Sequence, residues 1–209
     1  GVVYCALGWA CWKTYVGRPE TDSFRQCAMS LLGSGLSDAD HLEDALSVRE
    51  ATLATMRRVG APLQGILSIQ GNLANSYLHL GRLDEGLRLL GEVYSGHLNL
   101  FGEGHPMTLT QANNYATQLT SRGRHEEAKA LLRKTVPVAQ RILGDNDELT
   151  LTMRKNYAVA LWSDPAATLN SLRESVTMLE DMERIARRVL GGAHPLVVGI
   201  EGTLRAAQA

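Results

Sequence analysis

The sequence has few of the residues that build sheets or cross-linked folds, and it has no excess charge of either sign. Its 209 residues include only two Phe, three Trp and six Pro, while Leu, Ala, Arg and Glu are abundant, a mixture that favours helix over strand. The three cysteines, Cys5, Cys11 and Cys27, cannot all pair and show no CxxC spacing, which predicts a reducing compartment and no metal site. The 21 basic and 22 acidic residues nearly cancel, which argues against nucleic acid as a partner.

Signals for export or membrane insertion are also missing. The apolar start, residues 1–11, has no basic segment before it and is much shorter than the roughly 20 residues of a membrane span. No Asn-X-Ser/Thr acceptor occurs, so we expect a cytoplasmic location and no membrane partner. Residues 1–19 are interpreted either as an N-terminal helix packed through Trp9, Trp12 and Tyr15, or as the end of an upstream segment, since the chain begins with Gly.

An internal repeat of 42 residues is the strongest feature of the sequence. Asn72, Asn114 and Asn156 each begin a triplet that ends in Ala, and the three triplets are 42 residues apart. Between Gly144 and Gly191 the spacing grows to 47 residues, so about five residues are inserted, which we place in the turn over 163–170. A fixed period of this length is typical of stacked helical hairpins, because one hairpin alone cannot bury its apolar faces.

Within each period the apolar residues recur at spacings of three and four, first over one helix and then over a second. Gly81 and Gly123 mark the turns between them. His105-Pro106 and His194-Pro195 stand at repeat junctions, where we expect each histidine to be a cap or turn residue. Pro137 falls inside a predicted helix and should kink it. The predicted segments are hairpins over about 20–59, 66–104, 108–146 and 150–192, and a single helix over 195–209.

The repeat pattern resembles the kinesin light chain class of tetratricopeptide repeats. The residues that carry the resemblance are NLANSYLHLGRLDEGLRLL, NYATQLTSRGRHEEAKALL and the junctions LFGEGHP and VLGGAHP. The whole chain is also similar to kinesin light chain-like proteins of unicellular algae, through segments such as CWKTYVGRPETD and ARRVLGGAHP. The resemblance implies an all-α fold, a right-handed α-solenoid of about four hairpins with a terminal capping helix. True light chains join a motor heavy chain through a coiled coil, and no sustained heptads occur here, so we do not expect that partner.

The resemblance also implies that the first helix of each hairpin lines a concave groove for a peptide or protein segment. Asn72, Asn114 and Asn156 would grip the backbone of an extended peptide, because an amide both donates and accepts hydrogen bonds. The alternative interpretation is that these amides tie neighbouring helices together. The predicted groove residues are Asn72, Asn75, Asn113, Asn114, Arg154, Lys155 and Asn156. The two cations favour an acidic ligand, whereas a chaperone's carboxylate is not expected, since Gly71, Thr110 and Thr152 replace the required cations.

Catalysis is not expected from the sequence. The six histidines are dispersed, and neither HExxH nor GxSxG occurs, so we predict no catalytic residue, no cofactor and no metal. The acids Glu126 and Glu127, followed by Lys129, are interpreted as a surface feature that complements the helix dipole. The sequence therefore predicts a non-catalytic interaction scaffold. The alternative is a regulatory or oligomerising arm of a larger protein that contains an enzyme.

Overall fold

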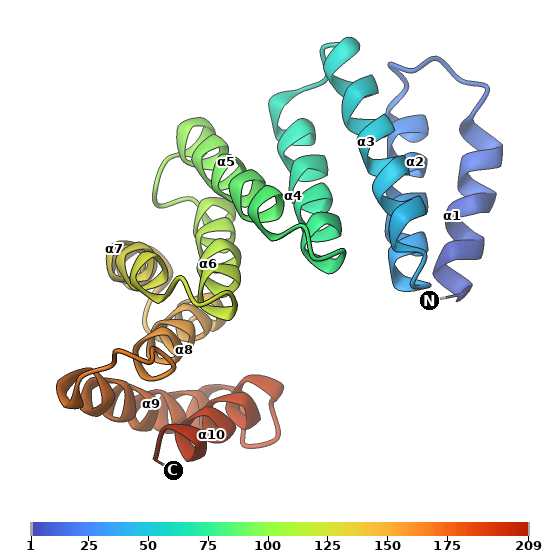
Figure 1. The fold of residues 1–209 in the computed structure, drawn as a ribbon. Helices are drawn as coiled ribbons and strands as arrows, with labels where there is room; N and C mark the ends of the chain where they lie inside the picture. The colour runs from blue at the N-terminus through green and yellow to red at the C-terminus, as the bar shows by residue number, and fades with distance from the viewer. Residues whose placement is uncertain (1, 209) are drawn as a thin grey trace. The chain divides into compact units, whose positions relative to one another are not determined.

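The chain folds into α-helices joined by short turns. The computed structural model describes residues 2–208, and no strand occurs among them. Two compact units divide the chain, one over 1–100 and one over 101–209. The ends of the predicted terminal segments, residues 1 and 209, lie outside the described residues. The all-α class built from helical hairpins, which the 42-residue period predicts, is confirmed (Figure 1).

The first unit is a row of neighbouring helices. Its helices are α1 (Val2–Tyr15), α2 (Ser23–Asp38), α3 (Leu42–Arg58), α4 (Leu63–His79) and α5 (Leu83–Phe101), of which the last ends at the first residue of the second unit. Helix α1 packs on α2, α2 packs on α3, and α3 packs on α4 (Figure 1). A Cβ atom placed on Gly86 of α5 would lie 2.6 Å from the Leu78 side chain of α4. Short side chains therefore let α4 and α5 approach closely.

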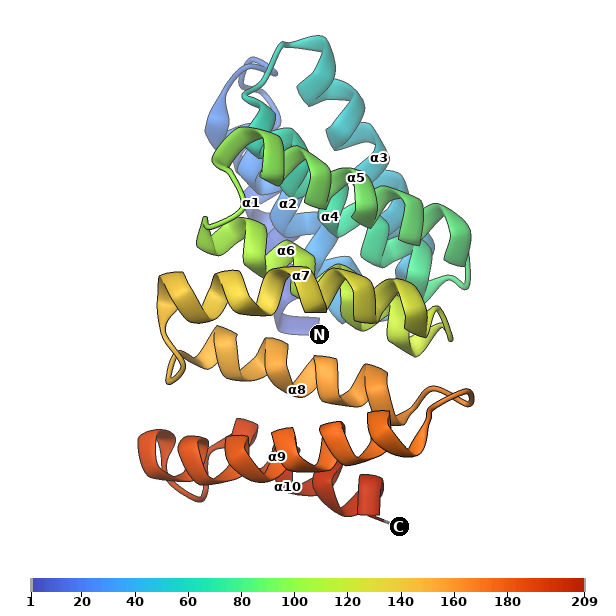
Figure 2. The same ribbon diagram turned by 90° about the vertical axis from the view of Figure 1, so that its left-hand side faces the viewer.

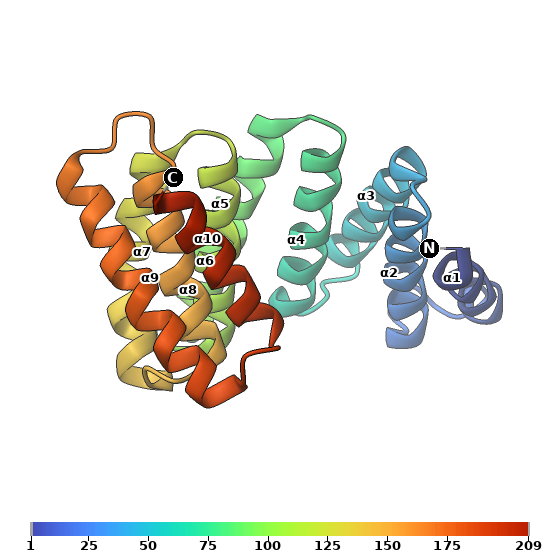
Figure 3. The same ribbon diagram turned by 90° about the horizontal axis from the view of Figure 1, so that it is seen from below.

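The second unit repeats the same plan. Its helices are α6 (Pro106–Ser121), α7 (His125–Leu143), α8 (Glu148–Trp162), α9 (Leu169–Leu190) and α10 (Pro195–Gln208). Helices α7, α8 and α9 form successive layers (Figure 2), and α10 lies along α9 (Figure 3). Leu109 of α6 and Leu151 of α8, 42 residues apart, are both fully buried. The repeat frame thus places equivalent residues in equivalent core positions.

The junction motifs act at the helix starts. The Nδ1 atom of His105 accepts a hydrogen bond from the backbone N–H of Met107, with Pro106 in the first turn of α6. His194 accepts in the same way from Leu196, and the Asp147 carboxylate, which takes this place at the start of α8, accepts from Leu149. Each side chain satisfies a backbone donor that has no partner within its helix. The prediction that these histidines are caps is confirmed.

The five-residue insertion is shared between a turn and a helix. The turn between α8 and α9 runs over 163–168, whereas 122–124 suffices between α6 and α7. Helix α9 has 22 residues and α7 has 19. The prediction that the insertion lies in this turn is therefore only partly correct, because much of the extra length lengthens the following helix, α9.

Two glycines bring α1 and α2 into backbone contact. A Cβ atom on Gly8 would lie 2.8 Å from the Cα atom of Leu32, and one on Gly35 would lie 2.5 Å from the carbonyl oxygen of Tyr4. Of the aromatic residues expected to pack this helix, Trp12 packs against the core residues Leu32 and Leu36, and the ring of Tyr15 stacks on that of Phe24 in α2. Trp9 keeps 46% of its surface exposed. Close approach at glycine and the packing of Trp12 and Tyr15 together hold α1 on α2, while other apolar side chains of α1 are exposed.

Residues 2–208 contain no helix that is both long enough and apolar enough to cross a bilayer.

Helix α7 continues through Pro137 to Leu143. Because a helix of this length runs through the proline, the missing backbone donor does not end it.

Candidate functional site

Three of the polar side chains on the first helices of the second unit form one hydrogen-bonded cluster. The Nδ2 atom of Asn156 on α8 lies 2.8 Å from Oδ1 of Asn113 and 3.1 Å from Oγ1 of Thr117, both on α6. The Thr117 hydroxyl in turn donates to the backbone carbonyl of Asn113 over 2.9 Å. Asn113 is buried. The cluster therefore joins the first helices of two successive hairpins.

This geometry fixes the direction of the Asn156 amide. Its two N–H groups are both directed at α6, to Asn113 and Thr117. The carbonyl oxygen of Asn156 has no hydrogen bond within the described chain. A side chain held in this way presents an acceptor and no donor, because a primary amide has only two N–H groups.

A shallow depression of about 170 Å³ lies beside the cluster. It is lined by Thr117, Thr120 and Ser121 of α6 and by Asn156 and Val159 of α8. Although these side chains carry hydroxyls and one amide, the surface that they expose in the depression is almost entirely apolar. A surface of this size and chemistry suits the contact of one or two residues of a chain rather than the enclosure of a drug-sized molecule, which needs about 300 Å³ or more.

The other predicted groove residues of this unit lie on the same two helices but outside the cluster. Asn114 is exposed on α6, and Arg154 and Lys155 are half-buried on α8. A Cβ atom on Gly199 of α10 would lie 3.8 Å from the Lys155 ammonium nitrogen. Lys155 therefore extends toward α10, and so away from the depression that lies between α8 and α6.

The remaining predicted residues, Asn72 and Asn75, lie on α4 of the first unit. Asn72 is half-buried and Asn75 is exposed. Polar ties in that unit use other residues. Nη1 of Arg49 on α3 donates to Oγ of Ser76 on α4 over 2.5 Å, and the Tyr77 hydroxyl on α4 donates to Oε1 of Glu50 on α3 over 2.9 Å. Burial lowers the pKa of Arg49 from its ordinary value, with Asp38 acting in the opposite direction. Of the seven predicted residues, the structure brings Asn113 and Asn156 into direct contact.

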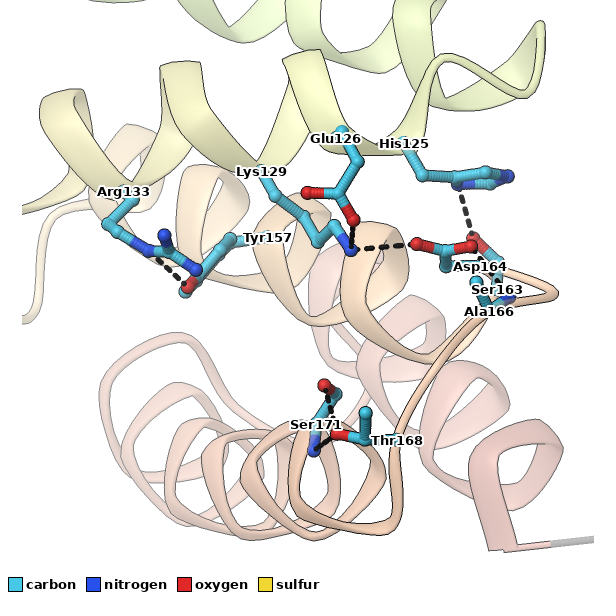
Figure 4. A network of polar contacts seen from close by, with 10 residues as sticks. All are labelled: His125, Glu126, Lys129, Arg133, Tyr157, Ser163, Asp164, Ala166, Thr168 and Ser171. Carbon is cyan, nitrogen blue, oxygen red and sulfur yellow. Dashed lines mark hydrogen bonds and ion pairs between the residues drawn. The ribbon is translucent and has the colours of Figure 1, made fainter.

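A second polar network at the hairpin tips was not expected (Figure 4). Lys129 of α7 lies 2.7 Å from Asp164 in the turn before α9 and also pairs with Glu126 (Figure 4). The Lys129 side chain is 11% exposed and that of Asp164 is 9% exposed. The interpretation of Lys129 as a surface residue is therefore wrong. It rests on the position of Lys129 along its own helix, which does not indicate a partner in the next hairpin.

The charges of this network shift one another's pKa values. The hydrogen bond from Lys129, helped by one from the backbone of Ala166, lowers the pKa of Asp164 from 3.8. The hydrogen bonds to Asp164 and then to Glu126 raise the pKa of Lys129 from 10.5. Nearby, Nδ1 of His125 and Oγ of Ser163 lie 3.5 Å apart (Figure 4). Both shifts favour the charged forms, which indicates a structural pair and not an acid or base poised for proton transfer.

A depression of about 340 Å³ opens between the α6–α7 turn and the α8–α9 turn, with Asp164 in its lining. In the described chain, no group of three or more His, Cys, Asp or Glu side chains is arranged to hold a metal ion. The insertion predicted at the turn over 163–170 could have indicated this surface from the sequence, since insertions in a repeat usually lie in loops on one face.

Comparison with known proteins identifies the repeat. Two models of the tetratricopeptide repeat match, one over residues 66–106 and the other over residues 108–181, which together make up more than half of the chain. Among curated proteins no match was found.

Solved structures share the fold at low identity. A single-substitution variant of a Podosopora anserina protein, described as a putative kinesin light chain with nearly identical TPR-like repeats, is 20% identical, with a TM-score of 0.72, over 89% of this chain and 84% of that one. BtubC (BKLC) from P. vanneervenii is 15% identical, with a TM-score of 0.76, over 99% of this chain and 86% of that one. The Rap protein complexed with competence and sporulation factor is 13% identical, with a TM-score of 0.62, over 99% of this chain and 57% of that one.

The 42-residue hairpins, the capped junctions and both family matches thus agree, and the chain belongs to the tetratricopeptide repeat proteins, with a fold like that of kinesin light chain-like members.

Proposed function

We propose that this chain is a protein-binding scaffold and that its second unit holds an extended segment of a partner across the depression between α6 and α8. Tetratricopeptide repeats generally serve protein interaction. The observation that carries the proposal is the fixed amide of Asn156, which donates both N–H groups to residues of α6 and lines the depression. Its carbonyl oxygen is an acceptor for a backbone N–H of the ligand.

The predicted residues then divide into two roles. Asn113 and Thr117 position Asn156, because they accept its two hydrogen bonds. Asn114, which is exposed, would contact the ligand directly. Arg154 adds positive charge on α8, so an acidic segment is preferred. Lys155 extends toward α10 and is left out of this contact. In this assignment the two interpretations of the amides apply to different atoms of Asn156. Its N–H groups tie α8 to α6, and its carbonyl oxygen accepts from the ligand.

Asn72 occupies the same place in the repeat frame and Asn75 lies one turn further along α4. They offer a second contact of the same kind in the first unit. A stack of such hairpins can hold a partner, as the Rap protein complexed with its factor shows for that protein. Binding of this kind uses shape and hydrogen bonds, and it requires no cofactor.

The proposal is tested by selecting peptides from a random display library on the folded chain. We expect acidic residues to be enriched among the peptides selected. Each enriched peptide is then resynthesised with single backbone N-methyl groups, which remove one N–H at a time. One N-methyl position should reduce the affinity by about tenfold, as expected where a buried acceptor loses its donor.

Two variants locate the site. Ser121→Arg places a long side chain in the depression, whereas Ser95→Arg puts the same change on an exposed position of α5. We expect the first to abolish binding of the selected peptides and the second to leave it unchanged, with both proteins equally helical by circular dichroism. Equal binding by both variants, or a library from which no peptide is enriched, would overturn the proposal.

A further inference from the structure

A groove on the first unit lies between α1 and α3, over α2. Its volume is about 450 Å³. Trp9 and Trp12 of α1 form one wall, and Leu32 and Leu36 of α2 lie in its floor. Trp9 is 46% exposed although it is one of the largest apolar residues of the chain. The groove shares no residue with the depression between α6 and α8, so it is a separate surface.

The opposite wall is a stripe along α3. It consists of Asp44, Ser47, Val48 and Ala51, which are spaced i, i+3, i+4 and i+7. This spacing covers two helical turns, or about 10 Å at 1.5 Å per residue. Trp9 and Trp12 are likewise one turn apart on α1. The walls are therefore ridges of helices, and the groove between two such ridges can receive the ridge of another helix.

One end of the groove is negative. Asp44 is exposed and makes no hydrogen bond or ion pair within the described chain. Glu43 precedes it, and Asp40 lies in the turn before α3. The nearest cation along this helix, Arg49, is buried and donates to Ser76 of α4. The carboxylates at this end are therefore not neutralised by a cation on their own helix.

We propose that this groove binds a short amphipathic helix of a partner protein, with its apolar face between Trp9 and Val48 and an Arg or Lys directed at Asp44. The apolar walls supply the contact area, since burial of aliphatic and aromatic surface drives helix-in-groove binding. The free carboxylate selects a basic residue at one end of the ligand and rejects an acidic one. This preference is the reverse of the acidic preference proposed for the second unit.

The probes are two synthetic helices of about 15 residues, long enough to be helical when bound. Both carry Leu at i, i+4 and i+7 on an Ala and Gln background. One has Arg a turn before the first Leu and the other has Glu at that position. Binding is followed by fluorescence polarisation of the labelled peptides with the whole chain. We expect the Arg peptide to bind about fivefold more tightly than the Glu peptide, as one partly exposed ion pair allows.

Charge reversal tests the role of Asp44. Asp44→Lys should weaken the Arg peptide by about fivefold and favour the Glu peptide instead. The matched control is Asp84→Lys, which makes the same change in the first turn of α5 and should leave both affinities unchanged. Because both variants place a cation in the first turn of a helix, any loss of helix stability affects them alike.

Steric block tests the groove itself. Ala51→Arg fills it from an exposed position, and Ala54→Arg on the same helix lies outside the lining. The first variant should abolish binding of the Arg peptide and the second should not. The proposal is wrong if neither peptide binds, if both bind equally, or if Asp44→Lys leaves the preference unchanged. It is also wrong if sedimentation shows a dimer that only Ala51→Arg dissociates, because a second copy would then fill the groove.

Discussion

The ammonium group of Lys129 on α7 lies 2.7 Å from a carboxylate oxygen of Asp164, in the turn that precedes α9. Both side chains are largely shielded from solvent. The pair joins the second helix of one hairpin to the turn of the next. A contact of this kind resists the separation of neighbouring repeats, on which the stability of a repeat protein depends.

The pair makes stability depend on pH in a defined direction. The pKa of Asp164 is lowered from 3.8 by Lys129, so the stabilisation is present above that pH and is lost as the pH falls through the native pKa. The pKa of Lys129 is raised from 10.5, so its contribution is present below that pH and is lost as the pH rises further. We expect wild type to exceed Asp164→Asn in free energy of unfolding at neutral pH and to converge with it in acid.

Urea unfolding of both proteins at a series of pH values measures this difference. Asp145→Asn, at an exposed aspartate of the α7–α8 turn, controls for the general loss of one carboxylate. A difference between wild type and Asp164→Asn that stayed constant from neutral pH into strong acid would contradict the assignment.

The cap at His105 can be exchanged for the one that the chain uses at Asp147. His105→Ala removes the acceptor of the Met107 N–H and should cost about 1 kcal/mol in the free energy of unfolding. His105→Asp should recover most of that loss, because a carboxylate caps α8 at the equivalent place. Thermal unfolding of the three proteins compares them. If His105→Asp were no more stable than His105→Ala, stacking of His105 on Phe101 and not capping would explain the loss.

Two glycines of the first unit should respond to alanine with opposite signs. In Gly35→Ala the new methyl group meets the backbone of α1 at 2.5 Å and 2.8 Å, and we expect a loss of about 1 to 3 kcal/mol from overpacking. In Gly71→Ala nothing lies within 4 Å, so a helix-interior alanine should stabilise α4 by about 0.5 to 1 kcal/mol. Denaturant midpoints distinguish the two, and a stabilising Gly35→Ala would mean that α1 does not pack at this distance.

Pro137 should be replaceable with a gain in stability. It is exposed in α7 between the buried residues Val136 and Val138. Pro137→Ala restores a backbone donor one turn after Arg133 and removes the ring, which should stabilise α7 by up to about 3 kcal/mol. Calorimetry of the variant tests this, with Ala130→Gly as a control for helix propensity at an exposed site. A less stable Pro137→Ala would show that the repeats need the local geometry that proline imposes.

The sequence alone determined the class of the fold and the position of its repeating parts. Asn-x-Ala, Leu and Gly recur every 42 residues, which indicates that equivalent residues have equivalent surroundings. The helical hairpins and the buried positions of Ala74, Ala116 and Ala158 follow from this recurrence. The caps at His105 and His194 also follow, because capping is a local event of two or three residues.

The tertiary structure decided which side chains meet between repeats. Neither the 2.8 Å bond of Asn156 to Asn113 nor the pairing of Lys129 with Asp164 can be read from the period, since each depends on how two hairpins stack. The exposure of Trp9, on the wall of the groove opposite the unpaired Asp44, likewise depends on how closely α1 approaches α2. Periodicity fixes which face of a helix is apolar, whereas the polar contacts between hairpins depend on distances that only packing sets.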